Sequence, residues 1–212
     1  MKKILKILVP EFILNLRYKY KNYLERKKFS KMNLKEVFKE IYINNLWSTD
    51  KNCKNRKFNS GLGSHSKEII DEYINSVVLF LKDLKVKPDV VDLGCGDFNV
   101  GKRISPLFES YTGVDIVEKL VKRNNSIFAS DTISFVCKDI TKDDLPRADM
   151  ICVRQVLQHL SNADIANFLN KISLLQTLLI LKPVLWERQT RWILIGLIHL
   201  YIMLVRKLAG IG

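Results

Sequence analysis

Residues 89–97 read DVVDLGCGD, and this short stretch decides the fold class of the chain. The apolar run at 90–93, broken only by Asp92, has the length and composition of a buried strand. Gly94 and Gly96 follow it directly, and glycine lets a backbone turn sharply and lets a ligand approach closely. A strand that ends in such a turn and leads into a helix is typical of a parallel α/β sheet.

Outward from this stretch, short apolar runs alternate with segments compatible with helices. We expect strands at 89–93, 111–115, 133–137, 149–153 and 177–181, and helices at 66–84, 116–125, 143–146 and 162–175. This alternation predicts a doubly wound, mostly parallel Rossmann-like sheet with helices on both faces, preceded by N-terminal helices. Because such sheets bind ligands at the carboxyl ends of their strands, the residues that follow each strand are candidates for a site.

Acidic residues follow successive strands of the expected sheet. Asp115 ends the second strand, where a carboxylate can accept hydrogen bonds from ribose hydroxyls. Asp139 follows the third strand, where it can accept from an exocyclic amine such as that of adenine. Each feature alone also fits a turn or a helix cap. Together with the glycine turn they favour a nucleoside site.

The glycine turn also limits which nucleoside ligand fits. Asn99 stands where the dinucleotide fingerprint G-x-G-x-x-G requires its third glycine, which disfavours a pyrophosphate. Asp92 and Asp97 give the turn a negative charge. This charge suits a ligand with an amine and a sulfonium better than a polyphosphate.

Four motifs resemble those of the class I S-adenosylmethionine-dependent methyltransferases, in particular bacterial enzymes for small molecules or sugars. They are VDLGCGD at 91–97, GVDI at 113–116, FVCKDI at 135–140 and DMICVRQVLQHL at 149–160, and the resemblance spans about residues 60–182. It implies that Gly94 and Gly96 face the methionine part of the cofactor, Asp115 the ribose, and Asp139 with Ile140 the adenine. The implied cofactor-binding set is Asp92, Gly94, Gly96, Asp115, Ile116, Asp139, Ile140 and Arg154.

The acceptor side of the site has two catalytic candidates. His159 is the histidine of the fourth-strand motif and can act as a general base, although a packed structural histidine is an equal alternative. Arg154 follows the same strand and can steer an anionic acceptor or pair with a nearby aspartate. A lid similar to that of some bacterial relatives is expected from Trp47, Ser60, Gly61, Gly63 and Ser64. The alternative for residues 60–64 is an ordinary connector before the next helix.

The net charge of +13 is concentrated at the two ends of the chain. Residues 1–57 carry 16 Lys/Arg and 5 Asp/Glu, residues 58–165 carry 13 and 16, and residues 166–212 carry 6 and 1. From Pro10 onward, apolar side chains form one stripe of an expected basic helix. That helix can dock on its own domain, lie on an anionic membrane, or bind nucleic acid.

The chain divides into four expected segments. They are a basic amphipathic helix at 1–29, an N-terminal helical lid segment at 30–66, a cofactor-binding α/β domain at 67–182 and an apolar tail at 183–212. The tail departs from the seven-stranded pattern of the family, and one interpretation is a truncated or frame-altered C-terminus. Its run of 14 residues at 192–205 is shorter than the ~20 that span a bilayer.

The sequence therefore predicts a methyltransferase that uses S-adenosylmethionine for O- or N-methylation of a small-molecule or saccharide-type acceptor. Four separated cysteines and three separated histidines predict neither a disulfide framework nor a metal site, and favour the cytoplasm. The basic N-terminus adds a peripheral position at the inner face of the membrane. The alternatives are a non-catalytic nucleoside-binding or membrane-surface protein of the same fold, and an RNA methyltransferase. The acidic middle of the chain disfavours nucleic acid.

Overall fold

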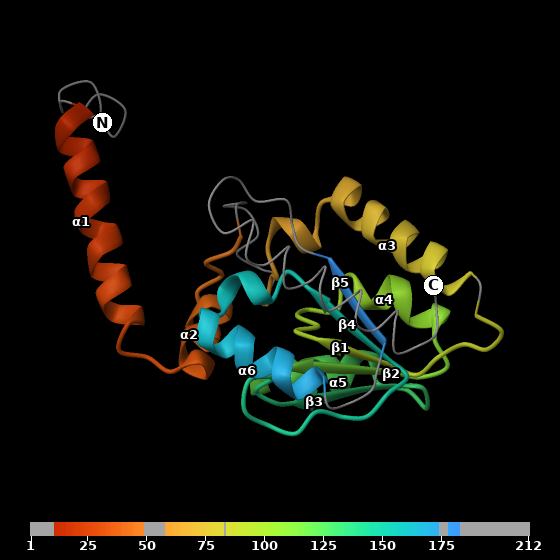
Figure 1. The fold of residues 1–212 in the computed structure, drawn as a ribbon. Helices are drawn as coiled ribbons and strands as arrows, with labels where there is room; N and C mark the ends of the chain where they lie inside the picture. Colours follow the sequence, from red (N-terminus) through yellow and green to blue (C-terminus); the bar gives the residue numbers. More distant parts are fainter. Residues whose placement is uncertain (1–10, 49–57, 83, 174–177, 183–212) are drawn as a thin grey trace.

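A five-stranded parallel sheet lies at the centre of the computed structural model, which describes residues 11–48, 58–82, 84–173 and 178–182. Its strands are β1 (Val90–Leu93), β2 (Tyr111–Asp115), β3 (Ile133–Cys137), β4 (Met150–Arg154) and β5 (Leu178–Lys182). They run in the order β3-β2-β1-β4-β5 (Figure 1). The winding direction reverses between β1 and β4, and a ligand crevice is expected at such a switch point.

Helices cover both faces of the sheet, as the alternation of the sequence predicts. On one face, α3 (Lys67–Leu81), α4 (Gly101–Ile104) and α5 (Glu118–Phe128) contribute to one buried cluster. On the other face, α6 (Asn162–Ser173) packs through a second buried cluster that includes Phe168. All four residues of β1 are buried, because this strand lies at the middle of the sheet.

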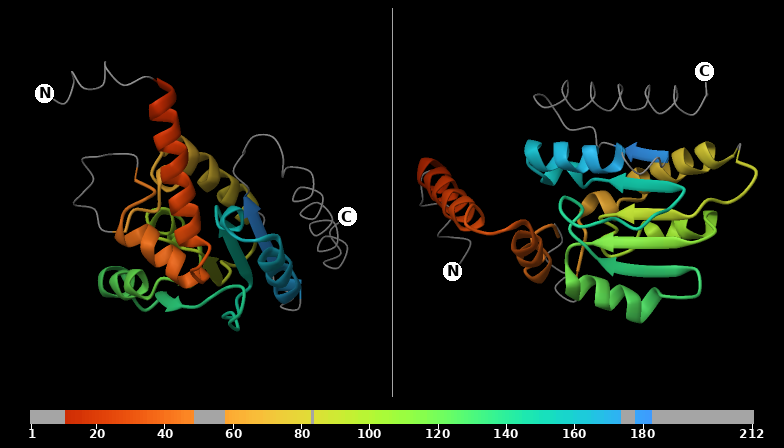
Figure 2. Two further views of the ribbon diagram at one scale, coloured as in Figure 1. Left: turned by 90° about the vertical axis from the view of Figure 1, so that its left-hand side faces the viewer. Right: turned by 60° about the horizontal axis from the view of Figure 1, so that its bottom comes forward.

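Two further helices precede the sheet. The first turn of α2 (Leu34–Ile43) is fixed by a capping box, in which Asn33 and Glu36 accept each other's backbone N–H. Tyr42 of α2 is buried with Leu120 of α5. By contrast, α1 (Glu11–Phe29) stands away from the sheet (Figure 1 and the right view of Figure 2), and most of its described side chains are exposed. The interpretation of α1 as a helix docked on its own domain is therefore wrong for the described residues.

The expected helix at 143–146 is also wrong, because these residues are irregular between β3 and β4. Asp139 Oδ1 accepts hydrogen bonds from the backbone N–H and the hydroxyl of Thr141, at 2.9 and 2.6 Å. Asp143 Oδ2 in turn accepts from the Asp139 N–H at 2.8 Å. These side chains stabilise tight turns in place of a helix.

Several element ends differ by a few residues from the expected ones. β1 and β4 each begin one residue later, because Asp149 Oδ2 accepts from the N–H of Asp89 and thereby ties the two strand entrances together. α5 begins at Glu118, since Asp115 Oδ1 accepts from the N–H of Val117 just before it. β5 likewise begins one residue later than expected, and α3 ends at Leu81.

Some predictions fall on residues that the structure does not describe. They concern the first ten residues, Cys53, and the apolar tail at 183–212 with His199. Among the described helices, none has the length and apolar character needed to cross a membrane.

Candidate active site

A pocket opens at the carboxyl ends of β1, β2 and β4, where the strand order reverses. It encloses about 930 Å³ of space, the open mouth included. The predicted site residues that line it are Trp47, Ser60, Ser64, Asp92, Gly94, Gly96, Asp115, Ile116, Asp139, Ile140, Arg154 and His159. Gly61 and Gly63 are not among its lining residues. The fold thus gathers at one place residues that are up to 112 positions apart in the sequence.

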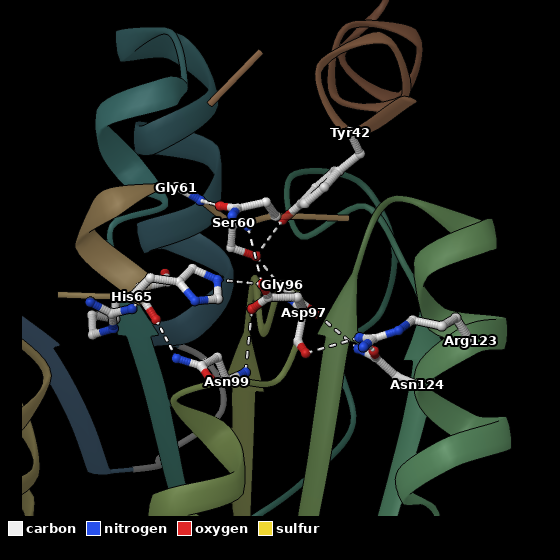
Figure 3. Close-up of polar contacts among 12 residues, drawn as sticks. Tyr42, Ser60, Gly61, His65, Gly96, Asp97, Asn99, Arg123 and Asn124 are labelled. Carbon is white, nitrogen blue, oxygen red and sulfur yellow. Dashed lines mark hydrogen bonds and ion pairs between the residues drawn. The ribbon is translucent and has the colours of Figure 1, made fainter. Parts of the chain in front are cut away.

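The turn after β1 depends on its glycines for both backbone conformation and packing. Gly94 and Gly96 have φ angles of 77° and 58°, a region in which a side chain is strained. A Cβ on Gly94 would lie 2.2 Å from a methyl of Val156, and one on Gly96 would lie 2.4 Å from the hydroxyl of Ser60. The Asn124 amide of α5 donates to the Gly96 carbonyl at 2.8 Å (Figure 3), which fixes the turn from the opposite side.

Two buried carboxylates stand beneath this turn. Asp115 accepts hydrogen bonds from the N–H groups of Gly96 and Val117, at 3.2 and 3.0 Å. Burial raises the pKa of Asp115 to about 6, although these backbone hydrogen bonds favour the charged form. Burial also raises the pKa of Asp92, against the hydrogen bond that it accepts from the Tyr111 hydroxyl. Both groups therefore sit in a weakly solvated, negatively charged part of the pocket.

At the mouth of the pocket, Asp139 lies next to apolar side chains. It is partly exposed, and Ile140 beside it is buried. One oxygen of Asp139, Oδ1, accepts the two hydrogen bonds from Thr141. The other oxygen lies 3.9 Å from the Lys142 ammonium. With Ile116 on the same wall, the mouth combines apolar surface with a hydrogen-bond acceptor.

Arg154, the last residue of β4, contacts the segment that covers the pocket. Its guanidinium donates to the Gly63 carbonyl at 3.0 Å and to the Ser64 hydroxyl at 2.8 Å. It lies over the ring of Tyr73 at 5.5 Å. Burial lowers the pKa of Arg154 against the opposing charge of Asp92. In the structure this side chain holds residues 60–64 in place.

A family model described as a methyltransferase domain matches residues 90–175. The matched stretch runs from β1 into α6 and beyond, and it contains the glycine turn, Asp115, Asp139 and His159. The family model thus supports a methyltransferase domain in residues 90–175. In contrast to the family model, a search of curated proteins finds no relative of the chain.

Several solved structures are similar to this chain in fold. The magnesium protoporphyrin IX methyltransferase of Synechocystis PCC 6803 with bound S-adenosylmethionine is 18% identical, with a TM-score of 0.48 over 68% of this chain and 72% of that one. The N-methyltransferase NodS of Bradyrhizobium japonicum WM9 with S-adenosylhomocysteine is 14% identical, with a TM-score of 0.49 over 64% and 67%. The phosphoethanolamine N-methyltransferase 1 of Haemonchus contortus is 18% identical, with a TM-score of 0.47 over 66% and 29%.

The pocket of the methyltransferase domain suits the chemistry of its cofactor, S-adenosylmethionine. The cradle after β1 has no side chains at Gly94 and Gly96, and a buried carboxylate stands at the end of β2. Tyr73 also belongs to the lining, and its buried hydroxyl has the thiol of Cys152 as its hydrogen-bond partner. For comparison, the described residues contain no cluster of three metal-ligating side chains.

Aromatic rings also line the pocket. The His159 ring, in the 3-10 turn η4 (Leu157–His159), lies 5.0 Å from the Trp47 ring and 6.2 Å from that of Phe38 on α2. Partial burial lowers the pKa of His159, so the imidazole is neutral at pH 7. The residue as a whole is exposed to solvent. A neutral imidazole in this place can accept a proton.

Several residues that line the pocket are not predicted by the sequence. Phe38 and Tyr42 are part of an apolar stripe on α2 whose spacing does not reveal that it faces a ligand pocket. Gln155 has a φ angle of 57° directly after β4, which no sequence pattern indicates. Its flexible side chain packs against Gly63, where a Cβ would lie 2.1 Å from its end and would make it move.

Proposed function

We propose that this methyltransferase domain acts on a small molecule that contains a ring, such as a saccharide, and methylates a hydroxyl or an amine on it. The observation that carries the proposal is the group of rings in the pocket lining. Phe38, Trp47 and His159 contact one another there, in the same pocket as the glycine turn and Asp115. Aromatic rings offer rigid apolar faces that pack against a flat or CH-rich molecule.

S-adenosylmethionine, when bound, supplies a methyl group on a positively charged sulfur. In the proposal, Asp115 accepts hydrogen bonds from the ribose hydroxyls, and Asp139 with Ile140 binds the adenine. Gly94 and Gly96 leave room for the methionine part, with Asp92 behind them. His159 takes the proton from the hydroxyl of the acceptor molecule. The rings of Phe38 and Trp47 align that molecule for in-line attack.

Methyl transfer to a panel of acceptors tests this proposal. The full chain is incubated with S-adenosylmethionine and saccharides, phenols, small aromatic amines or short RNAs, and S-adenosylhomocysteine formation is measured. We expect turnover with at least one small ring-bearing acceptor and none with RNA. Turnover with RNA alone would contradict the proposed acceptor class. Cofactor binding without turnover on any acceptor would favour the non-catalytic alternative.

We also propose that α1 places the protein on an anionic membrane surface. The observation in favour is its exposed apolar stripe, of which Leu16 and Tyr20 are 67% and 63% exposed. Basic side chains flank this stripe, and α1 carries six Lys/Arg and two Glu. An exposed helix that carries an apolar stripe and several basic side chains suits the interface between lipid headgroups and acyl chains. At its end, α1 is tied to α2 by an ion pair of 2.5 Å between Lys28 and Glu40.

Liposome flotation of two double variants tests the membrane proposal. Leu16→Glu with Tyr20→Glu removes apolar side chains from the stripe, whereas Asn15→Glu with Asn22→Glu adds the same charge on the opposite side of α1. Burial of one large apolar side chain contributes about 1.5–3 kcal/mol, so the first variant should partition at least ~10-fold less than the second. Equal flotation of both variants would show that the stripe does not contact the lipid.

A further inference from the structure

Residues 59–66 form one wall of the proposed cofactor pocket. Ser60 and Ser64 line the pocket, yet their segment precedes the sheet domain in the sequence. It is held on the β4 side by Arg154, which contacts Gly63 and Ser64. On the β1 side, the Asn99 amide donates to the Ser64 carbonyl at 2.7 Å (Figure 3). The shape of this wall therefore depends on side-chain contacts between distant parts of the chain.

Asp97, directly after the glycine turn, is the centre of these contacts. Its Oδ2 accepts from the Ser60 N–H at 3.2 Å and lies 2.7 Å from Nε2 of His65 (Figure 3). In return, the Ser60 hydroxyl accepts from the Asp97 N–H at 2.8 Å. The same hydroxyl lies 3.1 Å from that of Tyr42. Ser60 is thereby placed directly over Gly96.

The pair of His65 and Asp97 is shielded from water. Their side chains are 22% and 9% exposed, so the hydrogen bond between them is stronger than one on the surface. Burial would raise the pKa of Asp97, but His65, with the N–H groups of Ser60 and Asn99, brings it below the ordinary value. The Asp97 carboxylate is therefore charged at neutral pH, and it needs a buried donor.

We propose that His65 is a positioning residue for the cofactor: through Asp97 it holds residues 59–66 closed over the glycine turn. Without His65, the Asp97 carboxylate loses its closest donor, and Ser60 is no longer fixed above Gly96. The cofactor-facing wall then opens, and binding weakens. This inference rests on the proposed cofactor site.

Calorimetric titration of the full chain with S-adenosylhomocysteine tests the inference in four proteins. His65→Ala removes the donor to Asp97, while His65→Gln keeps an amide N–H within reach of the same carboxylate. Arg103→Ala is the matched control, because it breaks an ion pair of 2.6 Å with Asp71 at a position that does not line the pocket. We expect His65→Ala to weaken binding about tenfold or more. His65→Gln and Arg103→Ala should stay within about threefold of the wild type.

The outcomes separate this inference from the proposed function. Equal or tighter binding by His65→Ala would overturn the inference, and so would a loss in His65→Gln as large as in His65→Ala. A loss of the same size in Arg103→Ala would show a general stability effect and would also overturn it. No binding by the wild-type chain would instead overturn the proposed cofactor site itself. Thermal unfolding of each protein without ligand shows whether a variant is folded before it is titrated.

Discussion

Replacing Asp115 with alanine is expected to weaken S-adenosylhomocysteine binding by ten- to a hundredfold. The backbone N–H groups of Gly96 and Val117 hold the carboxylate in place. Each carboxylate oxygen can accept a second hydrogen bond, and the proposal assigns these positions to the ribose hydroxyls. A hydrogen bond to a charged group contributes about 1.5–3 kcal/mol, which corresponds to the expected loss. Isothermal calorimetry measures this affinity directly, and wild-type affinity in Asp115→Ala would contradict the ribose assignment.

The pH dependence of the same titration provides an independent check. The pKa of about 6 means that Asp115 is mostly protonated at pH 5 and mostly charged at pH 7 in the free protein. Only the charged form offers both oxygens as acceptors to the ribose, so affinity should rise as the pH increases through this range. Asp115→Asn keeps the shape but cannot titrate, and its profile should be flatter. Equal slopes in the two proteins would assign the pH dependence to another group.

The contribution of Asp115 to the stability of the ligand-free protein changes with pH in the opposite direction. The ordinary pKa of an aspartate is 3.8, and in the folded chain that of Asp115 is about 6. Between these values the folded state binds more protons than the unfolded state, so the contribution of Asp115 to stability falls as the pH rises. The ionised Asp115 therefore opposes folding while it favours cofactor binding.

The sequence predicts the sheet well, because hydrophobic runs and strand-end residues follow from general rules of parallel α/β folds. A carboxylate that ends a strand must lie at the same edge as the other strand ends, so the sequence alone places Asp115 and Asp139 near Gly94. The fold class and the S-adenosylmethionine cofactor are confirmed. The roles of the individual site residues remain predictions.

The contacts that the sequence does not reveal are those between distant segments. His65 and Asp97 are 32 residues apart, and no periodicity links them. Residues 60–64 read as a hydroxyl-rich turn, and that pattern does not reveal that Arg154 donates to the Gly63 carbonyl and the Ser64 hydroxyl. Similarly, an apolar stripe on a helix has the same spacing whether the helix packs on its domain or stands free, as α1 does. Only the three-dimensional structure shows which segments contact one another in these cases.

Replacing His159 with alanine should lower turnover on a hydroxyl acceptor at least a hundredfold and leave S-adenosylhomocysteine affinity almost unchanged. Burial lowers the pKa of His159, so the ring is neutral and able to accept a proton at pH 7. It lines the pocket beside Trp47 and Phe38. General-base assistance contributes about 10²–10⁴ in rate, whereas cofactor binding does not depend on it. The assay measures S-adenosylhomocysteine formation with the acceptor that is turned over among the tested saccharides, phenols and amines.

His159→Phe separates a base from a packing residue. A phenyl ring keeps the ring contacts with Trp47 and Phe38 but has no nitrogen to accept a proton. If His159 is the base, His159→Phe should be as slow as His159→Ala while retaining wild-type thermal stability. If the ring only packs, His159→Phe should keep its turnover, and His159→Ala should lose turnover and stability together. Full turnover in both variants would show that His159 is not needed, and that alignment of the acceptor beside Trp47 and Phe38 accounts for the rate.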